Sequence, residues 1–68
     1  MNTLNEQLRT LRHKQNLSQK QLAALSGVHQ NTILNFENAQ RSPSVETLSY
    51  LLEAMGYELV IRRKQVIS

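Results

Sequence analysis

Amide side chains gather in one short stretch of the sequence, between residues 30 and 38. An Asn or Gln amide can donate and accept a hydrogen bond at once, which matches the major-groove edge of adenine. If the stretch is a helix, this uncharged face would be free to contact nucleobases, and the alternative is a face that is merely solvated. The polar residues expected on it are Gln30, Asn31, Thr32, Asn35 and Asn38.

The charge of the chain favours a polyanionic partner. Its 68 residues include 8 Lys and Arg against 5 Asp and Glu, which gives a formal net charge of +3. Arg41 directly follows the amide stretch and Lys20 precedes it, so both are candidates for contacts with DNA phosphates. The alternative for each is an isolated surface base that only keeps the protein in solution.

Other classes of function find little support in the residues. Without cysteine the chain forms neither a disulfide nor a thiolate metal site, and its two histidines stand on different elements without matching carboxylates. Glu46 and Glu53 share a helix with no nucleophile and base nearby, so we expect no enzyme, no metal and no cofactor. No apolar run approaches the roughly 20 residues that span a bilayer, and the start lacks the apolar core of a signal peptide. We therefore expect a cytoplasmic protein without a membrane partner.

Two capping patterns predict the helices that precede the amide stretch. Thr3 and Glu6 have the spacing of a capping box and should begin a first helix. Ser18 and Gln21 form a second capping box, and the helix that follows should end at Gly27, which can adopt a left-handed conformation. The residues of this second helix expected to point inward are Leu22, Ala23 and Leu25.

A third helix should begin almost at once and carry the amides. Val28 and Ile33 have the spacing of a hydrophobic staple around His29, so the helix is expected over residues 30–38. Two short helices joined by a tight glycine-containing turn match the helix-turn-helix unit, which places its second helix in the major groove. His29 takes the cap position, where it either caps weakly through a ring nitrogen or reaches a phosphate or base.

A fourth helix and a final strand complete the predicted elements. Ser42 or Ser44 caps the helix and Gly56 ends it, with Val45, Leu48, Leu51, Leu52 and Met55 in helical register. Residues 57–62 then alternate as a strand does, and residues 64–68 are expected to fray.

The strand has no partner within the chain, which points to a second copy. A lone strand cannot satisfy its own backbone groups, and a chain this short, without covalent staples, gains stability from self-association. Antiparallel pairing of residues 57–62 about a two-fold axis would meet both needs. A disordered tail and a docked fifth helix are the alternatives. The residues expected in the dimer contact are Tyr57, Leu59, Val60 and Ile61.

The joint spacing of residues 4–56 resembles the Cro/C1-type (XRE) helix-turn-helix family, which includes lambdoid phage repressors and many bacterial antitoxins. The resemblance implies an all-α, lambda-repressor-like domain of four to five helices over residues 1–56. Residues 57–68 would be a dimerisation strand and tail, and the ending GYELVIRRK, residues 56–64, looks like the C-terminal strand of HipB-type antitoxins. The matching residues are Leu17-Ser18-Gln19, Leu22-Ala23, Gly27-Val28, Ile33, Phe36-Glu37, Pro43-Ser44 and Thr47-Leu48.

The resemblance also implies roles for individual residues. Arg12 would pair with Glu37 and so tie the first helix to the recognition helix. Asn38 stands where the family often has glycine, and we expect it to take the left-handed conformation there. The base-contacting residues would be Gln30, Asn31 and Asn35, with His29 beside them. The resemblance assigns a phosphate contact to Gln19. The other phosphate-contacting residues, expected from charge and from the exposed face rather than from the family, would be Thr32, Asn38, Arg41 and Lys20.

These inferences combine into an expected function. The chain should be a transcriptional repressor that binds double-stranded operator DNA as a homodimer, with recognition helices separated by roughly 34 Å on an inverted repeat. It would further be a HipB-like antitoxin with a cognate toxin, which regulates its own operon and lies at the nucleoid when bound. The alternatives are a phage or plasmid repressor without a toxin, and a protein-interaction module that has lost DNA binding.

Overall fold

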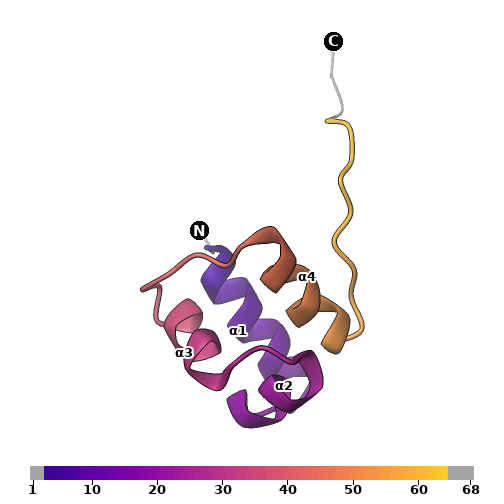
Figure 1. The fold of residues 1–68 in the computed structure, drawn as a ribbon. Helices are drawn as coiled ribbons and strands as arrows, with labels where there is room; N and C mark the ends of the chain where they lie inside the picture. The colour runs from indigo at the N-terminus through magenta and orange to yellow at the C-terminus, as the bar shows by residue number, and fades with distance from the viewer. Residues whose placement is uncertain (1–2, 65–68) are drawn as a thin grey trace.

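The computed structural model describes residues 3–64, and these contain four α-helices (Figure 1). Residues 65–68, part of the end expected to fray, lie outside the described residues. The prediction of an all-α, four-helix domain is confirmed, with every helix within about a residue of its expected place. The helices are α1 (Leu4–Lys14), α2 (Gln19–Ser26), α3 (Gln30–Glu37) and α4 (Val45–Ala54).

Hydroxyl caps determine where three of the four helices begin. The capping box of α2 is complete, since the Ser18 Oγ accepts from the Gln21 amide at 3.0 Å and the Ser18 amide donates to Gln21 Oε1 at 2.8 Å. The Thr3 hydroxyl accepts from the amide three residues along α1. Ser44, rather than Ser42, caps α4 through a 3.1 Å bond from the Thr47 amide.

The ends of α2 and α3 differ in how they reverse the chain. α2 ends as expected at Gly27, whose φ is 76°. The expectation of a left-handed Asn38 is wrong, because Asn38 has φ −87° and the positive φ of 60° falls on Ala39. The reason is the hydrogen bonding of a Schellman motif, in which the Gln40 amide donates to Asn35 O at 2.9 Å and the Ala39 amide donates to Phe36 O. The reversal therefore comes one residue later than the family pattern implied.

One apolar core joins the helices, with α3 packed against α1 and α2, and α2 against α4. Its buried side chains are Leu8, Leu22, Val28, Ile33, Phe36, Leu51 and Met55. Leu25, which was expected to point inward, is 61% exposed, and Val45, in helical register with the apolar residues of α4, is 69% exposed. On α2 the buried stripe is centred on residues 19, 22, 23 and 26, so Leu25 falls beyond its edge.

The expected C-terminal strand is not formed in the described part of the chain. Residues 57–64 form an extended, exposed segment that runs first alongside α4 and then beyond the helices (Figure 1). The Tyr57 amide donates to Leu52 O at 2.8 Å, a bond that closes the end of α4 rather than starting a ladder. A strand requires a neighbouring strand, and residues 3–56 fold into helices and turns that supply none.

Candidate nucleic-acid interface

α3 presents its polar residues outward because its apolar residues are fixed inward. Ile33 and Phe36 are 2% and 5% exposed and anchor the helix in the core. Gln30 and Asn31, in the first turn, are exposed, as a contact with base edges requires. Two further polar residues of the helix are half-buried, Thr32 and Asn35, and the exposed Asn38 follows its last turn.

The turn between α2 and α3 leaves the His29 side chain exposed. The Val28 side chain is buried in the core and the Val28 amide donates to Ser26 Oγ at 3.1 Å, so packing and a hydrogen bond together fix the turn. His29 is the N-cap residue of α3, yet its side chain makes no capping hydrogen bond. Of the two roles open to His29, weak capping therefore finds no support, and its ring stands at the start of the recognition helix.

A buried ion pair holds the other end of α3. Arg12 Nε and Glu37 Oε2 are 2.6 Å apart, and Arg12 Nη2 donates to Glu37 Oε1 at 2.7 Å. The two side chains are 10% and 6% exposed. The remaining guanidinium nitrogen donates to Leu17 O at 2.8 Å, in the turn after α1. This forked arrangement fixes α3 against α1 with directional contacts that apolar packing alone does not provide.

Glu37 also receives a hydrogen bond from α2, so one carboxylate joins three helices. The donor is Gln19, whose Nε2 lies 3.1 Å from Glu37 Oε1. Burial acts to raise the pKa of Glu37, but the hydrogen bonds from Arg12 and Gln19 outweigh it, and nearby positive charge adds to them. The pKa of Glu37 therefore lies below its ordinary value of 4.5.

Gln19 thus has a position that the sequence alone did not indicate. It was expected to contact a DNA phosphate, and the structure places it half-buried with its amide nitrogen bonded to Glu37. The amide oxygen takes no part in that bond. If Gln19 contacted DNA, the hydrogen bond between Gln19 and the Glu37 carboxylate would link that contact to the ion pair of α3.

Two residues that contribute to this surface were missed by sequence reasoning. The Asn5 side-chain amide donates to Phe36 O and, at 3.1 Å, to Arg41 O, which ties α1 to the end of α3 and to the loop beyond it. Both acceptors are backbone groups, so no residue pattern could reveal them. Leu34 is 39% exposed on α3, one turn after Gln30. The sequence could have predicted that Leu34 is exposed, because Leu34 falls outside the apolar stripe of Ile33 and Phe36.

Leu34 changes the chemistry that α3 offers. Its side chain stands four residues after Gln30 and four before Asn38, so the three share one face of the helix. An apolar side chain there can contact the methyl group of thymine while the amides bond to base edges. Beyond the helix, Arg41 and Lys20 are exposed and add positive charge at the surface.

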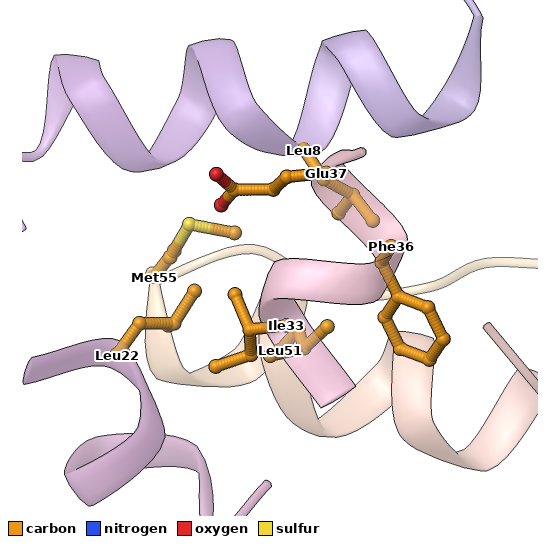
Figure 2. A pocket seen from close by; sticks show the side chains of 7 residues that line it. All are labelled: Leu8, Leu22, Ile33, Phe36, Glu37, Leu51 and Met55. Atoms are coloured by element: carbon orange, nitrogen blue, oxygen red, sulfur yellow. The ribbon is translucent and has the colours of Figure 1, made fainter. Parts of the chain in front are cut away.

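The core cavity found within residues 3–64 is too small for a ligand. The cavity shown in Figure 2 has a volume of about 10 Å³ between apolar side chains and the Glu37 side chain, whereas small-molecule sites need about 300 Å³ or more. Residues 3–64 contain no cluster of three side chains able to hold a metal ion. In the same residues, no helix has the length and apolar character needed to cross a membrane.

Comparisons with known proteins agree with this geometry. A family model described as helix-turn-helix matches residues 8–61. The chain is similar to a protein of Haemophilus influenzae named as an uncharacterized HTH-type transcriptional regulator, with 45% identity over 56 residues, 82% of this chain and 57% of the relative. It is also similar to the control protein C.SmaI of Serratia marcescens, with 40% identity over 53 residues, 78% of this chain and 63% of the relative.

The chain therefore spans less than two thirds of the length of both relatives. The family match, in contrast, covers all of α2, α3 and α4 and most of α1. It includes the buried ion pair and every residue of the exposed α3 face. On this evidence of sequence and geometry together, the chain belongs to the Cro/C1-type helix-turn-helix family.

Proposed function

We propose that this chain is a DNA-binding transcriptional repressor that acts on an inverted-repeat operator as a homodimer. The observation that carries the proposal is the exposed face of α3, on which Gln30 and Asn31 project from a helix anchored by Ile33 and Phe36. The names of the two relatives, a transcriptional regulator and a control protein, support the same class of function. Repression follows when the bound dimer covers the promoter.

The residues on and around α3 divide into two roles in this proposal. Gln30, Asn31, Asn35 and His29 contact base edges, and Leu34 adds an apolar contact with a thymine methyl. Residues that approach phosphates fix the position of the helix without selecting the sequence. These are Gln19, Thr32, Asn38, Arg41 and Lys20.

A binding experiment with selected DNA tests the proposal. Sequences selected from a random pool by the wild-type chain supply the operator, and fluorescence anisotropy compares its affinity with that of scrambled DNA at several salt concentrations. We expect selective binding that weakens steeply as salt rises, since each phosphate contact releases counterions. Equal affinity for selected and scrambled DNA would reject the proposal and favour a protein-interaction module.

Variants of three residues separate the two roles. Gln30→Ala should weaken operator binding by about 1–3 kcal/mol and relax the preference at one base pair. Arg41→Ala should weaken binding to all sequences alike and lower the salt slope. Gln7→Ala removes an amide from α1 that is also exposed and serves as the control, with affinity unchanged. An unaltered base preference in Gln30→Ala would show that α3 does not enter the groove as proposed.

Leu34 has its own test, because its proposed partner is a methyl group. Replacing each thymine of the operator in turn by uracil removes the methyl and keeps every hydrogen-bonding group. One such replacement should weaken the wild-type chain and leave Leu34→Ala unaffected. If every replacement affects both proteins equally, Leu34 contacts no thymine methyl.

We further propose that the repressor is the antitoxin of an operon that it regulates itself. This finer role is supported by the resemblance of residues 57–64 to the C-terminal strand of HipB-type antitoxins. Expression of the neighbouring gene should arrest growth, and co-expression of this chain should restore it. Growth that does not depend on this chain would leave a phage or plasmid repressor as the better description.

A further inference from the structure

An open groove lies between the outer face of α4 and the extended segment beside it, with a volume of about 430 Å³. Val45 and Tyr50 line it from α4, and Leu59 and Ile61 line it from the segment. Ile61 is 96% exposed, so almost nothing in this chain covers it. A cluster of exposed apolar side chains on a protein of this size marks an interaction surface.

The backbone of the segment points to the kind of partner. Residues 57–64 are extended and belong to no sheet within the described residues, so their amides and carbonyls, apart from the Tyr57 amide that bonds to Leu52 O, form an open edge. The side chains alternate between two faces, with Leu59 and Ile61 toward the groove and Val60 on the other face. Flanking charges of opposite sign, Glu58 and Arg62, share the face of Val60. An extended segment with these features is suited to pairing with a second copy of itself.

Two-fold symmetry restricts the registers in which two copies can pair. In a regular antiparallel pair, residues that stand opposite each other point to the same face of the sheet. A residue and its symmetry-related copy also point to the same face, whereas neighbours along a strand point to opposite faces. The two-fold axis therefore cannot lie between two neighbouring residues, because that register would set side chains of opposite faces against each other. One residue must therefore stand opposite its own copy at the axis. Within the alternating stretch, the possible centres are Glu58, Leu59, Val60 and Ile61.

Charge separates these four registers. A centre at Glu58 places two carboxylates opposite each other, which is destabilising. A centre at Leu59 sets Glu58 opposite Val60, which pairs a charge with an apolar side chain. A centre at Ile61 sets Glu58 opposite Lys64, but it also sets Arg62 opposite Val60 and Arg63 opposite Leu59, which makes two such unfavourable pairings. Of the four, the centre at Val60 alone places Glu58 opposite Arg62, and symmetry produces that pair twice.

We propose that two copies of this chain pair antiparallel through residues 57–63 with the two-fold axis at Val60. This inference rests on the proposed homodimeric repressor and specifies its subunit contact. Leu59 then stands opposite the partner subunit's Ile61, and the four apolar side chains form one face over α4 of each copy. Their bulk fills the groove that a single segment leaves open, while the two Glu58–Arg62 pairs lie on the outer face.

Charge reversal tests the register. Glu58→Arg and Arg62→Glu should each weaken self-association at least about tenfold, because two attractive pairs become two repulsive ones. An equimolar mixture of the two variants should associate like the wild type, and so should the double variant, since opposite charges meet again at both positions. Sedimentation equilibrium without DNA measures the association. Circular dichroism of α1–α4 verifies that each variant folds, as neither residue lies in the core.

Single cysteines test the same register by geometry, and the chain has no cysteine of its own. Val60→Cys should form a disulfide-linked dimer under mild oxidation, because the residue meets its own copy at the axis. Leu59→Cys or Ile61→Cys alone should not, since diagonal neighbours are about 7–8 Å apart, beyond disulfide reach. A mixture of those two variants should cross-link.

Each result either supports the register or overturns it. The register is overturned if the wild type is monomeric or if the single charge variants associate normally. It is also overturned if Leu59→Cys or Ile61→Cys alone cross-links, or if a different protein occupies the groove. The outcome is separable from that of the proposed function. If the register fails while a dimer still binds the inverted repeat, the repressor stands with another contact. If Val60→Cys cross-links but the dimer shows no DNA preference, the repressor fails and the register stands.

Discussion

Two regions of this chain, α3 and residues 57–64, differ in how far contacts within the chain fix their structure. α3 is fixed by groups within the chain: Ile33 is 2% exposed, and the Glu37 carboxylate receives bonds from α1 and α2. In residues 57–64, by contrast, Val60 is 57% exposed and Ile61 is 96% exposed. The difference teaches that a segment takes its final structure in a single chain only when that chain supplies its partners. Variants in the two regions should therefore respond to different variables.

The largest effect is expected from breaking the ion pair of α3. Arg12→Ala should lower the free energy of unfolding by about 3–5 kcal/mol, because it leaves the Glu37 carboxylate buried without its main partner. Urea denaturation followed by circular dichroism measures this loss. A loss below about 1 kcal/mol would show that apolar packing alone holds α3.

A variant in the tail provides the matched comparison. Ile61→Ser removes an apolar side chain that no core residue covers, so the unfolding free energy at high dilution should change by less than about 0.5 kcal/mol. At high protein concentration the same variant should lose stability relative to the wild type, because dimerisation stabilises the folded state by mass action. A concentration-independent loss would mean that the tail already packs within one chain.

The same distinction explains how much could be predicted from the sequence. Local signals located the helices, since the Ser18 capping box and Gly27 act on groups within a few residues of them. Contacts between distant parts of the chain were less accessible. The Arg12–Glu37 pair followed only from a family resemblance, and the bonds from Asn5 to backbone carbonyls had no signal at all. The alternation in residues 57–62 predicted a strand that the described residues do not form, because residues 3–64 contain no neighbouring strand with which it could pair.

Acid provides a reversible way to weaken the α3 anchor. The pKa of Glu37 is lowered in the folded protein, so the unfolded chain takes up the proton first as pH falls. The stabilisation is complete above the ordinary carboxyl pKa, declines below it, and is lost once pH passes through the lowered pKa of the folded state. The free energy difference between the wild type and Glu37→Gln should therefore shrink from about pH 6 to about pH 3. A difference that stays constant over this range would show that Glu37 titrates normally.

The smallest effect concerns the residue at which the chain leaves α3. Three helices end in the same Schellman hydrogen-bond pattern, with Asn16, Ala39 and Gly56 at positive φ. A side chain in this conformation costs about 1–2 kcal/mol, part of which is offset because glycine loses more entropy on folding. Ala39→Gly should therefore raise the unfolding free energy by about 0.5–1 kcal/mol.

Gly56→Ala is the matched control for this substitution. Gly56 has φ 86°, and a Cβ added to it would meet no atom within 4 Å, so the substitution alters backbone strain without a steric clash. It should lower the unfolding free energy by about the amount that Ala39→Gly raises it. Operator affinity should stay unchanged in Ala39→Gly, because the ion pair and the core already hold α3 in place. A gain in affinity would show instead that the end of α3 limits how well the helix fits the groove.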